Sequence, residues 1–429
     1  MERDGTGTRS TSGAVLVLLS LGLTVWRGPQ YLATPNFWAE DGMLFFAGAW
    51  NSGPLHGLVQ LPSGYLQLLP NLATSLAAWL VRSGALSLAS APRVTAVAGL
   101  LAQLVPIAVI AFAVAPTWGG VLRRAVAIAI VLVVPRTGNI WLNTVNSQFY
   151  LALAAIVILL EPPDLTPVRR WAYAALLVLC GLTGPVSALL TPLFVLKVWG
   201  ARTRSAILLA AVSSLCAAVQ VACVVASATG PARGTGLSVG AVGAVAWMRT
   251  VVLPVLGEHA AIAFGSRARP LVLGTPFAPP SAVFGMQLVA TLGLLVVVLV
   301  LGIAREIRWW LAGSYLLVTV SSLVGAVGDV RAMLGSVDGS ARYVFIPCVL
   351  VSWMLLFNIE RLVSARGAAY ALVLALAIGS DAWAWRSTLR WRADWPVWAD
   401  QVAAWERNPR LPLAIWPRGW TMQLVPPEP

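Results

Sequence analysis

Residues 281–304 read SAVFGMQLVATLGLLVVVLVLGIA, a run of 24 positions without a charged side chain. About 20 consecutive apolar residues are enough for a helix to cross the hydrocarbon core of a bilayer. Similar runs recur along the 429 residues, of which 59% are hydrophobic and only 10% are charged. Soluble domains carry about 25% charged residues. The composition therefore excludes a soluble protein and predicts an all-α polytopic membrane protein.

About eleven transmembrane helices are expected between residues 13 and 385. Besides 281–304, the clear spans are 13–27, 93–115, 205–229, 308–328, 343–360 and 367–385. The stretches 65–81, 121–135, 148–160 and 171–199 are less clear. Short loops that carry arginine stay on the cytoplasmic side of a membrane. Placing Arg305 and Arg308 inside predicts a cytoplasmic N-terminus over 1–12, outer loops over 28–92, 230–280 and 329–342, and an outer tail over 386–429.

Two threadings of the first half give the same number of spans. In one, 65–81 crosses the membrane and 171–199 is a single span, which leaves Arg123, Arg124, Arg169 and Arg170 outside. In the other, 65–81 is a surface helix of the first outer loop, and 171–199 is a hairpin of two short spans that turns at Gly184 and Pro185. The second threading is preferred because it places all four arginines inside.

Several function classes are disfavoured by what the spans and loops contain. The net charge of +13 comes largely from arginines that loop topology explains, so no nucleic-acid partner is expected. The four cysteines lie in apolar runs, which indicates neither a disulfide framework nor a cysteine metal site. No acidic residue falls in mid-membrane, which argues against ion-coupled transport. No P-loop, HExxH or GxSxG motif is present.

The first outer loop contains the sharpest local feature, Asn36-Phe-Trp-Ala-Glu-Asp-Gly42. The adjacent carboxylates Glu40 and Asp41 precede a short apolar helix at the membrane surface. Asp41 could simply cap that helix. Alternatively, one carboxylate, with Asp41 favoured over Glu40, is a general base, or the two bind a divalent cation such as Mg²⁺ or Mn²⁺.

Two further outer segments carry polar groups. The stretch 135–149 contains Asn143, Asn146 and Gln148, which either cap helix ends, bind sugar hydroxyls or orient the carboxylates of the first loop. At 338–343, Arg342 and Tyr343 are either interfacial anchors or a binding site for a lipid phosphate, with Arg331 and Arg249 as weaker candidates.

The tail is rich in tryptophan, including Trp398, Trp405, Trp416 and Trp420. This pattern favours an aromatic belt at the membrane surface, with an interfacial helix around 396–406. Aromatic rings also stack on sugars, so a saccharide-binding role for part of the tail stays open.

This layout resembles the GT-C superfamily of integral-membrane glycosyltransferases, which take sugars from polyprenyl-phosphate donors. The resemblance is carried by the acidic pair in the first outer loop, the Gly184-Pro185 turn and the late Arg342-Tyr343 pair. Trp38-Ala-Glu-Asp-Gly42, with Tyr65 downstream, is similar to uncharacterised bacterial members. The second outer loop lacks the acidic residue that several families have there, which puts a metal site of two carboxylates in doubt.

The resemblance implies inverting sugar transfer at the outer face of a bacterial cytoplasmic membrane. The partners would be a polyprenyl-phosphate-linked sugar, a glycan, lipid or protein acceptor, and the lipid bilayer. Asp41 or Glu40 would be catalytic, Arg342, Tyr343 and Arg331 would hold the donor phosphate, and Asn143, Asn146, Gln148 and Tyr65 would bind substrate. The alternatives are a polymerase or ligase that uses a diphospholipid-linked glycan, and a lipid or solute transporter.

Overall fold

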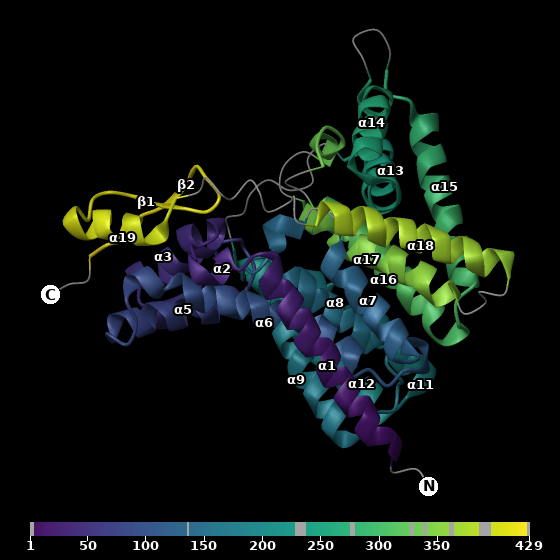
Figure 1. The fold of residues 1–429 in the computed structure, drawn as a ribbon, viewed down its shortest axis with the longest axis horizontal. Helices are drawn as coiled ribbons and strands as arrows, with labels where there is room; N and C mark the ends of the chain where they lie inside the picture. The colour runs from purple at the N-terminus through teal and green to yellow at the C-terminus, as the bar shows by residue number, and fades with distance from the viewer. Residues whose placement is uncertain are drawn as a thin grey trace.

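The computed structural model describes residues 4–134, 137–227, 237–274, 279–326, 330–337, 341–359, 364–385 and 396–426. The described chain is almost entirely helical (Figure 1). Seven helices in these ranges are long and apolar enough to cross a membrane: Ser10–Arg27, Leu88–Ala111, Arg204–Ala226, Val239–Leu273, Ala282–Leu301, Arg305–Val324 and Ala365–Trp383. The expectation of a helical, multi-pass membrane protein is confirmed at this level. The total of eleven spans and their orientation stay predictions.

The N-terminal half forms a bundle around one fully buried helix. Its long elements are α1 (Asp4–Arg27), α6 (Pro92–Ala111), α7 (Val121–Val133), α8 (Ser147–Leu160), α9 (Pro167–Leu182) and α12 (Arg204–Ala226). Every residue of α8 is buried. Its 14 residues extend only about 21 Å, less than the roughly 30 Å of bilayer hydrocarbon. Because protein surrounds α8 on all sides, its length does not have to match the bilayer.

α9 is the first arm of a helical hairpin. The chain turns through Thr183 and Gly184, where φ is 97°, and continues as α10 (Pro185–Ala188) and α11 (Thr191–Ala201). Both α9 and α11 pack on α12. This arrangement agrees with the threading that divides 171–199 at Gly184 and Pro185.

Short helices cover one end of this bundle, opposite the N-terminus (Figure 1). They are α2 (Gln30–Ala33), η1 (Asp41–Phe46), α3 (Ala47–Asn51), α4 (Pro54–Gly57) and α5 (Leu68–Arg82), which we call the surface helices. α5 buries Ala73 and Ala77 and exposes Leu72, Leu76 and Trp79 along one stripe. An exposed apolar stripe on a helix of this length fits a position in the membrane interface. α5 therefore supports the surface placement of 65–81.

The C-terminal half differs from expectation over 230–280, which the sequence indicated only as an outer loop. Most of its described part is helical: α13 (Val239–Trp247), η5 (Met248–Val252) and α14 (Leu253–Leu273), with a break at Gly257, where φ is 79°. Its glycines, prolines and arginines obscured the helices, but Gly243 and Gly265 permit close packing on Val289 and the Leu334 backbone. The remaining long helices are α15 (Ala282–Leu301), α16 (Arg305–Val324), α17 (Ala341–Asn358) and α18 (Ala365–Ala384). Short 3₁₀ turns are η2 (Leu88–Ser90), η3 (Pro116–Trp118), η4 (Thr137–Ile140) and η6 (Val330–Leu334).

The tail folds into α19 (Trp398–Arg407) and a hairpin of β1 (Leu413–Ile415) with β2 (Trp420–Met422), in which Ala414 pairs with Thr421. This unit lies against the surface helices (Figure 1). Trp398 and Trp405 are buried in a core shared with Phe37 and Phe46. The helix predicted around 396–406 is present. The belt interpretation is wrong for Trp398, Trp405 and Trp416, because these rings are buried in protein and cannot face lipid headgroups.

Candidate functional site

Asp41 joins the segment after α1 to the segment before α8. Its carboxylate is buried and accepts hydrogen bonds from the Thr144 hydroxyl at 2.7 Å, the Thr144 amide at 2.9 Å and the Val145 amide at 2.8 Å. Burial raises the pKa of Asp41 from its ordinary value of 3.8 to about 7, although these three donors favour the charged form. Asp41 therefore links two loops through hydrogen bonds, and its oxygens do not face open space.

Side-chain amides within residues 139–146 hydrogen-bond to the same segment. Asn143 donates to the Asn139 carbonyl at 2.9 Å, and the Asn143 side-chain oxygen accepts from the Asn146 amide groups. Helix α6 approaches this backbone closely at Gly99, where an added Cβ would lie 2.7 Å from the Asn143 nitrogen. Buried amides satisfied in this way hold a loop in one conformation. Asn143 is thus a structural residue of the loop.

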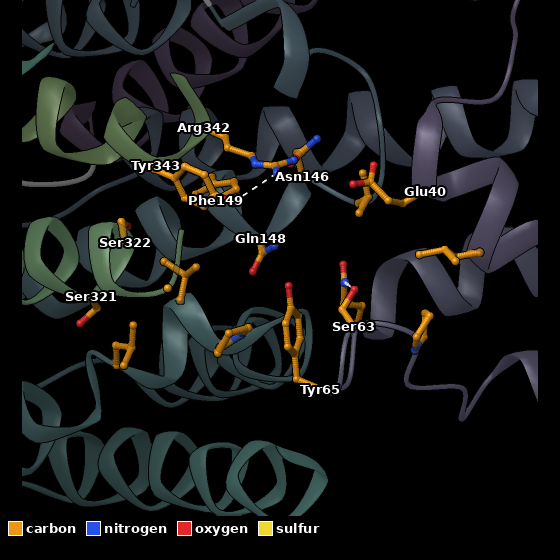
Figure 2. Close-up of a pocket in the computed structure, with 18 of the residues that line it drawn as sticks. Glu40, Ser63, Tyr65, Asn146, Gln148, Phe149, Ser321, Ser322, Arg342 and Tyr343 are labelled. Atoms are coloured by element: carbon orange, nitrogen blue, oxygen red, sulfur yellow. Dashed lines mark hydrogen bonds between the residues drawn. The ribbon is translucent and has the colours of Figure 1, made fainter. Parts of the chain in front are cut away.

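A cavity of about 390 Å³ opens where these segments meet the helix ends. Its walls come from η1 and the preceding Glu40, the turn segment 62–67, the start of α8, α10, the end of α16, the start of α17, and the hairpin residue Trp420. The polar side chains of its lining are Glu40, Ser63, Tyr65, Gln67, Asn146, Gln148, Ser321, Ser322, Arg342 and Tyr343. Figure 2 shows the Gln148 amide and the Tyr65 hydroxyl pointing into this space.

Glu40 and Arg342 are the acidic and the basic side chain of this lining. The Arg342 side chain extends toward Glu40, and the two groups interact electrostatically (Figure 2). The Arg342 guanidinium donates to the Tyr343 hydroxyl at 3.2 Å and lies 5.0 Å from the centre of that ring. That bond uses one of the five N–H donors of a guanidinium. The cavity thus offers one carboxylate and one guanidinium, with neutral hydrogen-bonding groups beside them.

The backbone before Glu40 is held in an unusual conformation. Ala39 has φ of 24°, which residues other than glycine rarely adopt. The Ala39 amide donates to the Trp416 carbonyl, and the Trp416 amide donates to the Phe37 carbonyl at 3.0 Å. A strained residue persists only where its surroundings impose the conformation. The C-terminal hairpin therefore fixes the direction in which Glu40 leaves the chain.

Tyr65 is positioned by its neighbour Leu66. The Leu66 carbonyl accepts from the Gly184 amide at 3.0 Å and from the Gln220 side chain at 3.0 Å, and the Leu66 amide donates to Gln220 at 3.2 Å. Gln220 also donates to the Gly181 carbonyl at 2.9 Å. One amide of α12 thus joins the first outer loop to the α9–α10 hairpin. On the other side of the turn, Gly184 lies against Gln148, because an added Cβ would fall 2.3 Å from the Gln148 Oε1.

The structure brings together most of the residues that the sequence singled out. Six of them line the cavity: Glu40, Tyr65, Asn146, Gln148, Arg342 and Tyr343. Three do not. Asp41 and Asn143 are buried in loop contacts, and Arg331 is exposed on η6. Arg249, the other arginine considered for a phosphate, is buried and donates to the carbonyls of Met333, Ser336 and Val337. It fixes the segment before α17.

Sequence reasoning missed four groups of the site. Ser63, Gln67, Ser321 and Ser322 line the cavity, but isolated serines and a single glutamine carry no motif. Gln220 had a detectable signal, because it is an amide inside an apolar span and such a group must find a partner.

The residues present do not fit the divalent-cation site that was considered for Glu40 and Asp41. Both Asp41 oxygens are already bonded to Thr144 and Val145. Within the described residues, no cluster of three or more His, Cys, Asp or Glu side chains could hold a metal ion. Hard cations prefer several oxygen ligands, and Glu40 alone among the lining side chains supplies a carboxylate.

No protein-family model, curated protein or solved structure matches this chain.

Proposed function

We propose that this protein is a membrane glycosyltransferase that moves a sugar from a polyprenyl phosphate to an acceptor hydroxyl at the outer face of the cytoplasmic membrane. The observation that carries the proposal is the pairing of Glu40 with Arg342 in one cavity at the helix ends. Direct displacement at an anomeric carbon requires a base and a phosphate-binding group in one site, and Glu40 and Arg342 line the same cavity.

The reaction follows from these positions. Glu40 accepts the proton of the acceptor hydroxyl as its oxygen forms a bond to the anomeric carbon. The bond from that carbon to the phosphate oxygen breaks, and the electron pair leaves with the phosphate. Arg342 stabilises the developing negative charge through a bidentate contact. Attack by the acceptor oxygen on the face opposite the departing phosphate inverts the anomeric configuration.

The neutral side chains hold the sugar. Tyr65, Asn146 and Gln148 line the cavity with Glu40 and Arg342 and supply both hydrogen-bond donors and acceptors. Asn146 follows directly on the segment that Asp41 anchors. In this proposal Asp41 is a positioning residue and Glu40 is the base, which reverses the order of preference drawn from the sequence.

The test is transfer by purified protein in nanodiscs with a polyprenyl-phosphate sugar. Glu40→Gln keeps the shape of the side chain and removes the base, so turnover should fall about 10²- to 10⁴-fold. Glu406→Gln makes the same change at an exposed position of α19 and should leave turnover unchanged. Near wild-type turnover in Glu40→Gln would overturn the assignment.

The donor distinguishes the alternatives. Transfer from a diphospholipid-linked glycan but not from a monophosphate donor would indicate a polymerase or ligase. Movement of the lipid across the bilayer without a covalent product would indicate a transporter.

A further inference from the structure

A groove of about 480 Å³ lies beside the cavity, between the surface helices and the C-terminal hairpin. One wall is formed by residues of η1 and α3 and the adjoining Ser52, and the other by β2 with Pro412 and Gln423. The groove is lined by Met43, Leu44, Ala47, Gly48, Asn51, Ser52, Pro412, Thr421, Met422 and Gln423. Figure 1 shows the hairpin beside α3.

The groove adjoins the cavity. Met43 and Leu44 line both. On the hairpin, Trp420 lines the cavity and the next residue, Thr421, lines the groove. A chain lying in the groove therefore has its end near Trp420 and Glu40, where the proposed base is.

The distance between the walls is fixed by hydrogen bonds at the groove. Asn51 donates to the Gln423 carbonyl at 3.1 Å and accepts from the Val425 amide at 2.9 Å. The Trp50 indole donates to the Val425 carbonyl at 2.8 Å. These contacts make the groove a preformed surface, and a preformed site loses less entropy on binding.

The lining indicates the kind of ligand. None of the ten lining residues is charged, although the chain carries a net charge of +13. Ser52, Thr421 and Gln423 are exposed and offer hydroxyl and amide groups, and Trp420 at the junction offers an aromatic face. A neutral lining argues against nucleic acid and acidic peptides, which basic side chains bind.

We infer that this groove binds a neutral oligosaccharide acceptor, with its terminal sugar against Trp420 and its hydroxyl directed to Glu40. The role of this groove in catalysis rests on the proposed function. The binding of sugar in the groove stands on its own and is tested without a donor.

The test is calorimetric titration of the full-length protein in nanodiscs with maltohexaose, α-1,6-mannohexaose and arabinohexaose. At least one probe should bind saturably. Thr421→Arg and Ser52→Arg place a long side chain in the groove from either wall at exposed positions, and each should weaken binding at least tenfold. Thr421→Ser keeps a hydroxyl at this position and should bind as wild type. Arg418→Gln, in the exposed turn of the same hairpin, is the matched control and should bind as wild type.

Two results would overturn the inference: no saturable heat with any of the three probes, or unchanged binding in both arginine variants. Melting curves confirm that the variants are folded. Because no donor lipid is present, a failure of sugar transfer from monophosphate donors would count against the proposed function and leave this measurement unaffected.

Discussion

Replacing Asp41 by asparagine should give a difference in stability from wild type that depends on pH: the variant is less stable at low pH, and it is equally or more stable at high pH. Asp41 accepts three hydrogen bonds from Thr144 and Val145 in a fully buried position on the outer surface helix η1. Its pKa is raised to about 7, above the 3.8 of the unfolded chain. Between these values the folded protein binds the proton more tightly. The contribution of Asp41 to stability is therefore fully present below about pH 4 and is lost as pH rises to about 7.

The magnitudes follow from the contacts. The difference between the two pKa values corresponds to roughly 4 kcal/mol. The neutral acid fits the site, because Thr144 has a hydroxyl that can reverse and accept the Asp41 proton. Asparagine fits less well, because its NH₂ group must face the amide of either Thr144 or Val145. One buried donor left without an acceptor costs about 1–3 kcal/mol. Wild type should thus be more stable near pH 5, and Asp41→Asn equally or more stable near pH 8.

The assay is thermal unfolding followed by intrinsic fluorescence of the 20 tryptophans in detergent, from pH 5 to pH 8. The difference between wild type and Asp41→Asn isolates this group, since the other titrating residues are common to both. Asp400→Asn, the same change at an exposed position of α19, is the matched control and should leave the pH profile like that of wild type. A constant difference across the pH range would refute the reasoning, as would a wild-type advantage that grows with pH.

Two further predictions concern the cavity. Arg342→Lys keeps the charge but loses the planar fork, so kcat/KM for a monophosphate donor should fall about 10²- to 10³-fold in steady-state kinetics; equal activity would remove Arg342 from phosphate binding. Gln220→Leu removes the amide that bonds Leu66 and Gly181, and should lower kcat through misplacement of Tyr65 while the protein still inserts. Gln220→Glu restores acceptors only and should recover part of the activity; if Gln220→Leu matches wild type, Gln220 does not position Tyr65.

The sequence was informative wherever a polar group had to be placed near a helix end. The turn at Gly184 and Pro185 and the surface helix over 65–81 followed from the arginines. Glu40, Gln148 and Arg342 are indicated as polar side chains near helix ends and Tyr65 by the family resemblance, and all four line one cavity.

The choice between Glu40 and Asp41 could not be made from the sequence. Adjacent side chains leave the backbone in different directions, and which one faces the cavity depends on Thr144 and Val145, about a hundred residues later. The helices over 239–273 were missed for a related reason. Their glycines and prolines read as loop residues until the neighbours that pack against them are known.

The contact of Trp416 with Ala39 and the place of Trp420 in the cavity wall have a consequence for biosynthesis. Glu40 precedes almost every helix of the bundle in the chain, and Trp420 follows all of them. The cavity cannot be complete before residue 420 has been made, because this wall segment follows every helix of the bundle. A molecule clipped before the hairpin can hold its helices in place and still lack the site. The site is therefore complete only when the hairpin docks on the helices made first.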